Sequence, residues 1–549
     1  MSAPIKPPRL LVIGLDGATF DLLQPMAAQG WLPNLSRAMD QGARGVLQST
    51  VPPLTAPAWC SFMTGLGPGG HGIFSFRHPL DNHLERTFVN SSDLRVPRLW
   101  HWLAEHGLTT GVVNLPMTWP PQPMPAGSYV VTGMLTPSIE SPFTDPPELA
   151  DGLRQAGYVC DLRIKLHERD FQSATGMTGI AQDLHQVLLR REEAIFRLLQ
   201  DNPTDVFTVV FETWDRLQHW AWQAIEELLA DDGSLERTAL HEAVESCYRE
   251  LDRVVGRLLA EAAAPETHVF FLSDHGFGPL RYRFHVDQWL AEQGWLVYTT
   301  GKATMRQRLR APLRRVKRLI PRTLLQRGRQ ALAVSRLIDW DRTSAYSGYA
   351  MEHAIYLNLR GREPYGSLDP ADGGQVLGQI EEALLAVRDP HSGLPVVQKT
   401  YRREEVYRGR YSANAPDLLF TLAAGYEPTS ELSSTGVISA AAAEGAGIHQ
   451  PSGVFMALGP GVRRGAVLPE HSIEDVLPTM FYALDLALPS TLDGQIIEAL
   501  FEPGFLASHP PLRGGDALPE VALLDGHGVS SADESAAIAD RLTALGYLR

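Results

Sequence analysis

Three short apolar segments, each running into a carboxylate, constrain the fold of this chain more than any other feature. They are LLVIGLD at 10–16, DVFTVVFETWD at 205–215 and HVFFLSDH at 268–275. Continuous aliphatic and aromatic runs of this length, separated by amphipathic stretches, indicate strands buried on both faces of a parallel α/β sheet. Ligands bind beyond the carboxyl ends of the strands in such sheets. We therefore expect all three carboxylates at one functional edge.

The covering layers and the domain organisation follow from the rest of the chain. Apolar residues recur at helical spacing in 97–106, 181–200 and 238–263. A chain of 549 residues exceeds what one simple core usually holds. We expect residues 1–125, 200–290 and 440–500 to form an α/β core. The Pro-rich stretch 114–127 would carry the chain out of this core. Insertions at 126–199 and 291–439 would form a cap, and an extension at 501–549 would end in a helix.

Composition excludes some partners and suggests a compartment. The formal net charge of -15 argues against general affinity for nucleic acid, so no nucleic acid polymer is expected as a partner. Three scattered cysteines fit neither a disulfide framework nor a CxxC metal site. The N-terminal apolar run is cut short at Asp16, and no run approaches the length of a membrane span. These features predict a cytoplasmic protein. They do not indicate an oligomeric state.

The segment 301–338 is a local exception to the acidic balance. It contains twelve Lys or Arg and no acid, with leucines interleaved as in LRAPLRRVKRLIPRTLLQ. One interpretation is a solvated helical pair packed on the body through its leucines. The other is a basic amphipathic face that contacts an anionic membrane peripherally or collects phosphorylated substrates.

Aspartates and histidines near the predicted strand ends form a candidate metal site. Asp215 precedes His219 by one helical turn, which turns both side chains to one side. Asp16, the adjacent Asp274 and His275, and His449 in GIHQPSGVF complete the set. Mixed carboxylate and imidazole ligands suit zinc or manganese. Two such cations a few ångströms apart suit in-line displacement at phosphorus, where they stabilise the entering and leaving oxygens.

Thr55 is the candidate nucleophile. It lies in VPPLTAPAWCSFMTGLGPGGHGI, just before a short apolar helix whose first turn would contain Pro57. Metal coordination activates a hydroxyl for attack, and a helix N-terminus attracts an anion. Without metal ligands nearby, Thr55 would be interpreted as a helix N-cap.

Five motifs, in order, resemble the type I phosphodiesterase and nucleotide pyrophosphatase branch of the alkaline phosphatase superfamily. They are VIGLDG, LTAPAWCSFMTGLGPGGHGI, ETWDRLQH, LSDHGFG and GIHQPSGVF, and the resemblance spans roughly residues 10 to 500. It implies an alkaline phosphatase-like core, a mostly parallel sheet between helices, with inserted cap elements. It implies a hydrolase of phosphate esters, either phosphodiester or nucleotide pyrophosphate bonds, on a small phosphorylated substrate. Thr55 would be transiently phosphorylated between two divalent ions, one held by Asp215, His219 and His449 and the other by Asp16, Asp274 and His275.

The chain departs from the family pattern at one substrate contact. Nucleotide pyrophosphatases place a phosphate-binding Asn a few residues after the His-Gly pair, and Phe76 occupies that position here. His78, Asn90 or Asn114 are candidates for the missing donor.

Two alternatives to the hydrolase remain. One keeps the metals and the nucleophile and makes the protein a phosphomutase, a phosphonate hydrolase or a head-group transferase. The other is a non-catalytic scaffold that binds membranes or partners through 301–338. Six buried ionisable ligands without metal would repel one another and cost stability, which argues against the scaffold.

Overall fold

The computed structural model describes residues 4–78, 87–161, 173–299, 337–348, 351–441, 445–514 and 532–544. Its centre is a nine-stranded, mostly parallel sheet with the strand order β18-β2-β17-β7-β1-β6-β3-β4-β5. The strands are β1 (Leu10–Leu15), β2 (Ala43–Gln48), β3 (Thr110–Val113), β4 (Tyr129–Val131), β5 (Thr144–Asp145), β6 (Val206–Phe211), β7 (His268–Leu272), β17 (Ser452–Leu458) and β18 (His471–Ser472).

The three apolar segments form the middle of this sheet, as predicted. β1 pairs in parallel with β6 on one side and with β7 on the other. All residues of the three strands are buried, with alternate side chains on opposite faces of the sheet. In β1, for example, Leu11 and Ile13 join one hydrophobic core and Leu10 and Val12 join the other.

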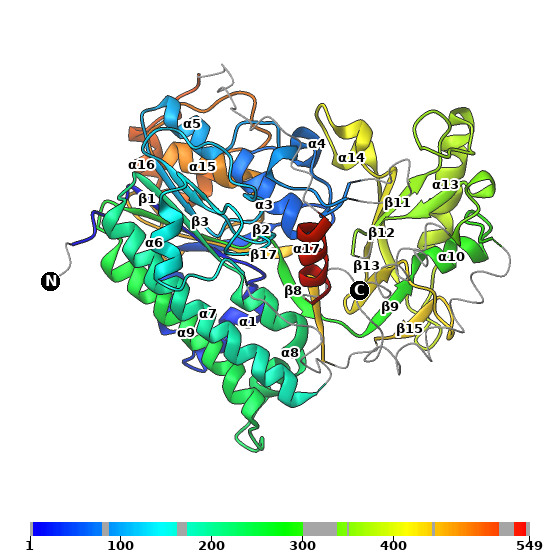
Figure 1. Ribbon diagram of the computed structural model, residues 1–549, viewed down its shortest axis with the longest axis horizontal. Coiled ribbons are helices and arrows are strands. Elements are labelled where there is room, and N and C mark those ends of the chain that lie inside the picture. The colour runs from blue at the N-terminus through cyan, green and yellow to red at the C-terminus, as the bar shows by residue number, and fades with distance from the viewer. Residues whose placement is uncertain are drawn as a thin grey trace.

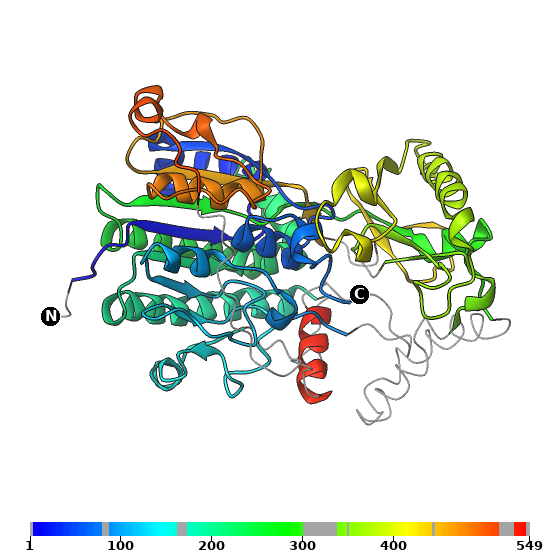
Figure 2. The same ribbon diagram turned by 90° about the horizontal axis from the view of Figure 1, so that it is seen from above.

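Helices cover both faces of the sheet (Figures 1 and 2). One layer consists of α1 (Phe20–Ala28), α2 (Pro33–Gln41), α7 (Ala174–Asp201), α8 (Thr213–Leu229) and α9 (Ala239–Glu261). The opposite layer consists of α3 (Thr55–Thr64), α4 (Pro68–His71), α5 (Leu99–Glu105), α15 (Val476–Ala483) and α16 (Pro503–Ser508). The C-terminal α17 (Ala532–Ala544) lies between the core and the second lobe and adds Ile538 and Leu542 to the same hydrophobic core (Figure 1). The predicted helices at 97–106, 181–200 and 238–263 correspond to α5, α7 and α9, and the predicted terminal helix to α17.

The described parts of the segment 126–199, 126–161 and 173–199, lie in the body of the core, whereas the sequence suggested that this segment forms a cap. Its strands β4 and β5 extend the edge of the central sheet. Its helix α6 (Leu149–Gln155) contacts β5, and α7 packs along α9. The Pro-rich stretch 114–127 therefore connects two neighbouring strands, β3 and β4, and does not leave the core.

A second lobe is built largely from the chain between β7 and β17 (Figure 1). A four-stranded antiparallel sheet contains β10 (Ala345–Ser347), β11 (Ala354–Leu357), β13 (Leu418–Leu422) and β12 (Val397–Arg402). A three-stranded sheet contains β14 (Tyr426–Thr429), β9 (Tyr282–His285) and β15 (Ile438–Ala440). With α10 (Val286–Glu292), α13 (Gly373–Leu385) and α14 (Arg403–Val406), these sheets surround a hydrophobic core of their own.

A two-stranded ribbon connects the lobes near the end of the central sheet. It consists of β8 (Gly276–Pro279) and β16 (Gly447–Gln450), in antiparallel register with His449 opposite Phe277. Most of the basic segment 301–338 lies outside the described residues.

Candidate active site

The structure brings all six predicted ligands to the carboxyl ends of the parallel strands. Asp16 directly follows β1, while Asp274 and His275 follow β7. β6 ends at Phe211, so Asp215 lies in the first turn of α8, one turn before His219. His449 reaches the same edge from the β8–β16 ribbon. The six side chains form two groups, each with ligand atoms within 4.8 Å of one another: Asp215, His219 and His449; Asp16, Asp274 and His275.

The first group is held by the contact between α8 and β16. Asp215 Oδ1 lies 3.2 Å from His449 Nε2 and 3.5 Å from His219 Nε2. The two imidazole Nε2 atoms are 3.1 Å apart. His449 Nδ1 donates a hydrogen bond to the Pro53 carbonyl at 3.0 Å, which leaves Nε2 to face the group.

The second group is oriented by hydrogen bonds from the surrounding backbone and from one indole. His275 Nδ1 donates to the Gly276 carbonyl at 3.0 Å, so its Nε2 faces Asp274 Oδ2 at 3.2 Å. Trp59 Nε1 donates to Asp16 Oδ2 at 3.1 Å, and the Gly17 N–H donates to Asp274 Oδ1 at 3.3 Å. Each carboxylate thereby keeps one buried oxygen, Asp16 Oδ1 and Asp274 Oδ2, to which no group in the described part of the chain donates.

The electrostatics of this site call for cations. Burial, with the nearby carboxylates of Asp274 and Asp215, raises the pKa of Asp16 well above its ordinary value. Burial and Asp215 raise the pKa of Asp274 to about 7. Burial also opposes ionisation of Asp215, but contacts with His219 and His449 outweigh it and hold the pKa of Asp215 well below its usual range. Three buried carboxylates and three imidazoles with inward-facing nitrogens fit two borderline divalent cations.

Thr55 lies against the second group at the start of a buried helix. Its Oγ1 is 3.2 Å from His275 Nε2, and the residue is fully buried. The helix begins at Thr55 itself, one residue earlier than expected, and its N-cap is Leu54. The structure therefore does not support Thr55 as an N-cap. Pro57 occupies the first turn, as predicted, and the positive end of the ten-residue helix dipole is directed toward the site.

The three candidates for the missing phosphate donor make contacts with their own surroundings. His78 Nε2 lies 3.3 Å from Asp93 Oδ2, on a side chain that is 40% exposed. Asn90 caps a short 3-10 helix by accepting from the Ser92 N–H. Asn114 is fully buried at the end of β3, has a φ of 61°, and accepts a hydrogen bond from the Tyr158 hydroxyl. These contacts of His78, Asn90 and Asn114 are made to Asp93, Ser92 and Tyr158 and not to Thr55.

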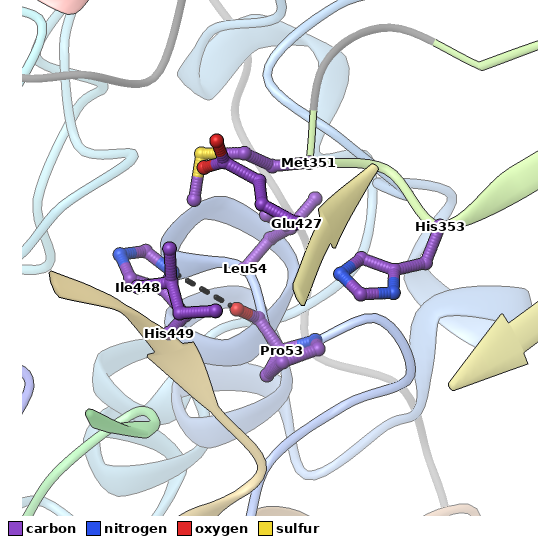
Figure 3. Close-up of a pocket in the computed structure, with 7 residues that line it drawn as sticks. All are labelled: Pro53, Leu54, Met351, His353, Glu427, Ile448 and His449. Atoms are coloured by element: carbon purple, nitrogen blue, oxygen red, sulfur yellow. Dashed lines mark hydrogen bonds between the residues drawn. The ribbon is translucent and has the colours of Figure 1, made fainter. Parts of the chain in front are cut away.

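A pocket beside Thr55 contains residues that sequence reasoning missed. It is lined by Pro53 and Leu54, which directly precede Thr55, by Ile448 and His449 of β16, and by three residues of the second lobe: Met351, His353 and Glu427 (Figure 3). Met351, His353 and Glu427 lie about 300 residues or more from Thr55 in the sequence, and none of them belongs to a motif. The sequence therefore does not indicate that they are close to Thr55. Trp59, which orients Asp16, lies in the helix predicted after Thr55, but nothing in the sequence indicates this role.

Comparison with solved structures shows the same fold in phosphonoacetate hydrolase. Phosphonoacetate hydrolase from Sinorhizobium meliloti 1021, in complex with phosphonoacetate, superposes with a TM-score of 0.52 at 15% identity. The alignment covers 88% of this chain and 99% of that one. Human ectonucleotide pyrophosphatase / phosphodiesterase 5 aligns with a TM-score of 0.47 at 13% identity, over 90% of this chain and 99% of that one. A search of curated protein sequences found no match.

The fold and the site together define a class of protein. A mostly parallel sheet whose carboxyl edge holds two Asp/His groups and a helix-borne hydroxyl is the architecture of phosphoester hydrolases of the alkaline phosphatase superfamily. The sequence model described as type I phosphodiesterase / nucleotide pyrophosphatase matches residues 10–451. The chain belongs to this family.

Proposed function

We propose that the protein hydrolyses phosphodiester or nucleotide pyrophosphate bonds with two divalent metal ions and a phospho-threonine intermediate on Thr55. The observation that carries the proposal is the contact of the Thr55 hydroxyl with His275, which belongs to one of two neighbouring groups of buried ligands. Asp215, His219 and His449 would hold one ion, and Asp16, Asp274 and His275 the other. Zinc is the metal we favour, with manganese as the alternative, because both accept carboxylate and imidazole ligands.

The chain's own residues support a two-step displacement. The bound ions would lower the pKa of the Thr55 hydroxyl and offset the charge that develops on the phosphoryl oxygens. Thr55 Oγ1 releases its proton to solvent and attacks phosphorus, the bond to the leaving oxygen breaks with its electron pair on that oxygen, and the phosphorus with its remaining ester arm is carried on Thr55. Water then attacks phosphorus and releases a proton, the bond to Oγ1 breaks, and Oγ1 takes up a proton so that the Thr55 hydroxyl is regenerated. The N-terminus of α3, which begins at Thr55, would stabilise the negative charge of the phosphoryl group in both steps.

The test compares the wild-type protein with Thr55→Ala on p-nitrophenyl phosphate, bis-p-nitrophenyl phosphate and p-nitrophenyl thymidine monophosphate. Metal content is measured on the same samples. We expect diester turnover and two metals per chain in the wild type, and a loss of at least about 1000-fold in kcat for Thr55→Ala with its metals retained. Full activity in Thr55→Ala would exclude the covalent mechanism.

The remaining outcomes address the alternatives. Metal-loaded protein that cleaves none of the three esters but transfers phosphate to an added alcohol would be a transferase or a mutase. Release of phosphate from a phosphonate instead would identify a phosphonate hydrolase. Stable, metal-free and inert protein that binds anionic vesicles would be the scaffold, with the segment 301–338 as its contact.

We also propose a cytoplasmic location. Cys60, Cys160 and Cys247 are buried free thiols, which fits a reducing compartment. Among the helices of the described residues, none combines the length and the apolar character needed to span a bilayer. Fractionation of cells that produce the full chain tests the location, and recovery in the membrane or secreted fraction would contradict it.

A further inference from the structure

The pocket beside Thr55 is placed to hold an organic group attached to the reacting phosphorus. Leu54 is adjacent to the nucleophile, and His449 belongs to the first ligand group. The rings of His449 and His275 are stacked with centroids 3.5 Å apart, which joins the pocket to the contact of His275 with Thr55. A substrate whose phosphorus lies at Thr55 would therefore extend one arm into this pocket.

The second lobe supplies the far wall through a strained turn. Met351 and His353 have φ values of 68° and 47°, in the left-handed region that non-glycine residues rarely adopt. Glu352, between them, points the other way and accepts a hydrogen bond from Ser75 Oγ of the core. The turn thereby directs Met351 and His353 into the pocket, where Figure 3 shows the His353 ring facing Pro53.

The charge of the lining is one-sided. Among the described residues that line the pocket, Glu427 is the one carboxylate, and none is a Lys or Arg. Arg283, the register neighbour of Glu427 on β9, lies with Nε 3.4 Å from Glu427 Oε2 and is not part of the lining.

The lining also limits the shape of the ligand. No Phe, Tyr or Trp lines the pocket among the described residues, although stacking on such rings is the usual means of holding a nucleobase or a quaternary ammonium. A primary ammonium instead needs a carboxylate for a charge-assisted hydrogen bond and an apolar wall for its methylene groups. Glu427, Met351, Leu54 and Ile448 provide that combination.

Building on the proposed function, we infer that this pocket binds an aminoalkyl ester arm of the substrate, with its primary ammonium on Glu427, and rejects anionic arms. The protein would thus act on small phosphodiesters of amino alcohols in preference to nucleotides or carboxylated compounds.

The test uses three p-nitrophenyl phosphodiesters whose second arm is 2-aminoethyl, its neutral isostere propyl, or carboxymethyl. We expect kcat/KM for the aminoethyl ester to exceed that for the propyl ester about tenfold or more, with the carboxymethyl ester poorest. In Glu427→Gln, which keeps the size and shape of the side chain but removes its charge, the aminoethyl preference falls to about threefold or less. Glu381→Gln is the matched control, because Glu381 also pairs with an arginine of the second lobe, Arg402, but lies outside the lining.

Met351→Lys is a second variant, in which an unbranched side chain of similar length brings a cation into the pocket. Its preference is expected to shift toward the carboxymethyl ester. Equal rates on the three esters, or a carboxymethyl preference in the wild type, would overturn the inference while leaving the hydrolase intact. Calorimetric titration of Thr55→Ala with the same esters ranks their affinities for the site in the absence of turnover. If wild type cleaves no ester, the proposed function fails, and this titration still decides the ligand class of the pocket.

Discussion

At the scale of single residues, Trp59 orients a ligand of the proposed metal site, although it is not itself a ligand. Its Nε1 donates to Asp16 Oδ2 and so turns the other carboxylate oxygen toward Asp274 and His275. Trp59→Phe keeps the apolar ring but removes the donor. We expect the affinity of the Asp16, Asp274 and His275 group for zinc to fall about 10- to 100-fold, measured by competition with a chromogenic chelator.

Trp100 offers a matched control for that substitution. It is also buried, but its Nε1 has no hydrogen-bond partner among the described residues. Trp100→Phe should leave zinc affinity unchanged. If both variants lose metal to the same extent, the effect comes from packing and the orienting role of Trp59 is wrong.

Glu474 gives a pH dependence that does not involve the metal site. Burial, with Asp475 and Asp493 nearby, raises its pKa to about 7, while a hydrogen bond with Ser61 opposes the shift. Between about pH 4.5 and 7 the folded chain keeps a proton on Glu474 that the unfolded chain has released. The contribution of Glu474 to the free energy of unfolding therefore falls as pH rises, by up to about 1.4 kcal/mol per pH unit.

Glu474→Gln should remove this dependence. In urea unfolding, the variant is expected to gain stability relative to wild type between pH 5 and pH 8. Glu502→Gln, at an exposed position, should follow the wild-type curve. A constant difference between Glu474→Gln and wild type across this range would show that Glu474 titrates normally.

At the scale of elements, the close approach of β1 and α3 sets the distance between the first carboxylate and the nucleophile. A Cβ on Gly14 would lie 2.7 Å from Trp59 Cη2 and 2.8 Å from Val210 Cγ2. Gly14→Ala should therefore push α3 away from β1 and cost about 1–3 kcal/mol of unfolding free energy. Zinc affinity should fall as well, because Trp59 moves from Asp16.

Gly152 serves as the comparison for that change. It lies in helix α6, where an added Cβ meets no atom within 4 Å. Gly152→Ala should be neutral or stabilise by up to about 1 kcal/mol, because alanine has the higher helix propensity. Denaturant unfolding measures both, and equal effects of the two substitutions would mean that β1 and α3 tolerate wider spacing.

Sequence periodicity could locate the central strands and four of the ligands because β1, β6 and β7 are continuous apolar runs with polar residues at their ends. Thr55 could be found because proline and glycine mark the ends of its helix. The edge of the sheet could not be predicted: β4 has three residues, too few to show a period, and the preceding prolines suggested an exit from the core. Glu427 and His353 reach the site only through the tertiary arrangement of the second lobe.

At the scale of the whole molecule, the two lobes contribute different parts of the site. The core supplies both ligand groups and Thr55, and the second lobe supplies a wall of the pocket. The lobes are joined near Thr55 by the Ser75–Glu352 hydrogen bond and by the Tyr407 hydroxyl, which donates to the Val51 carbonyl. Selectivity for the substrate can therefore change in the second lobe while the chemistry in the core stays the same.

Removing the metals should destabilise the whole chain, and more so at alkaline pH. Each ion, at a free concentration of 100 times its dissociation constant, adds about 2.7 kcal/mol to the free energy of unfolding. Without them, the raised pKa of Asp16 and that of Asp274, about 7, mean that these groups favour the folded state while protonated. That contribution is fully present below the pKa values of the unfolded chain and is lost as pH rises through about 7.

The difference in Tm between zinc-loaded and chelator-treated protein should thus be larger at pH 8 than at pH 6, as scanning calorimetry can measure. Asp274→Asn carries no titrating group at that position, so its metal-free form should lose less stability over the same range. A chelator without effect on Tm at either pH would mean that the six ligands fold stably on their own, and the two-metal proposal would then lose its physical basis.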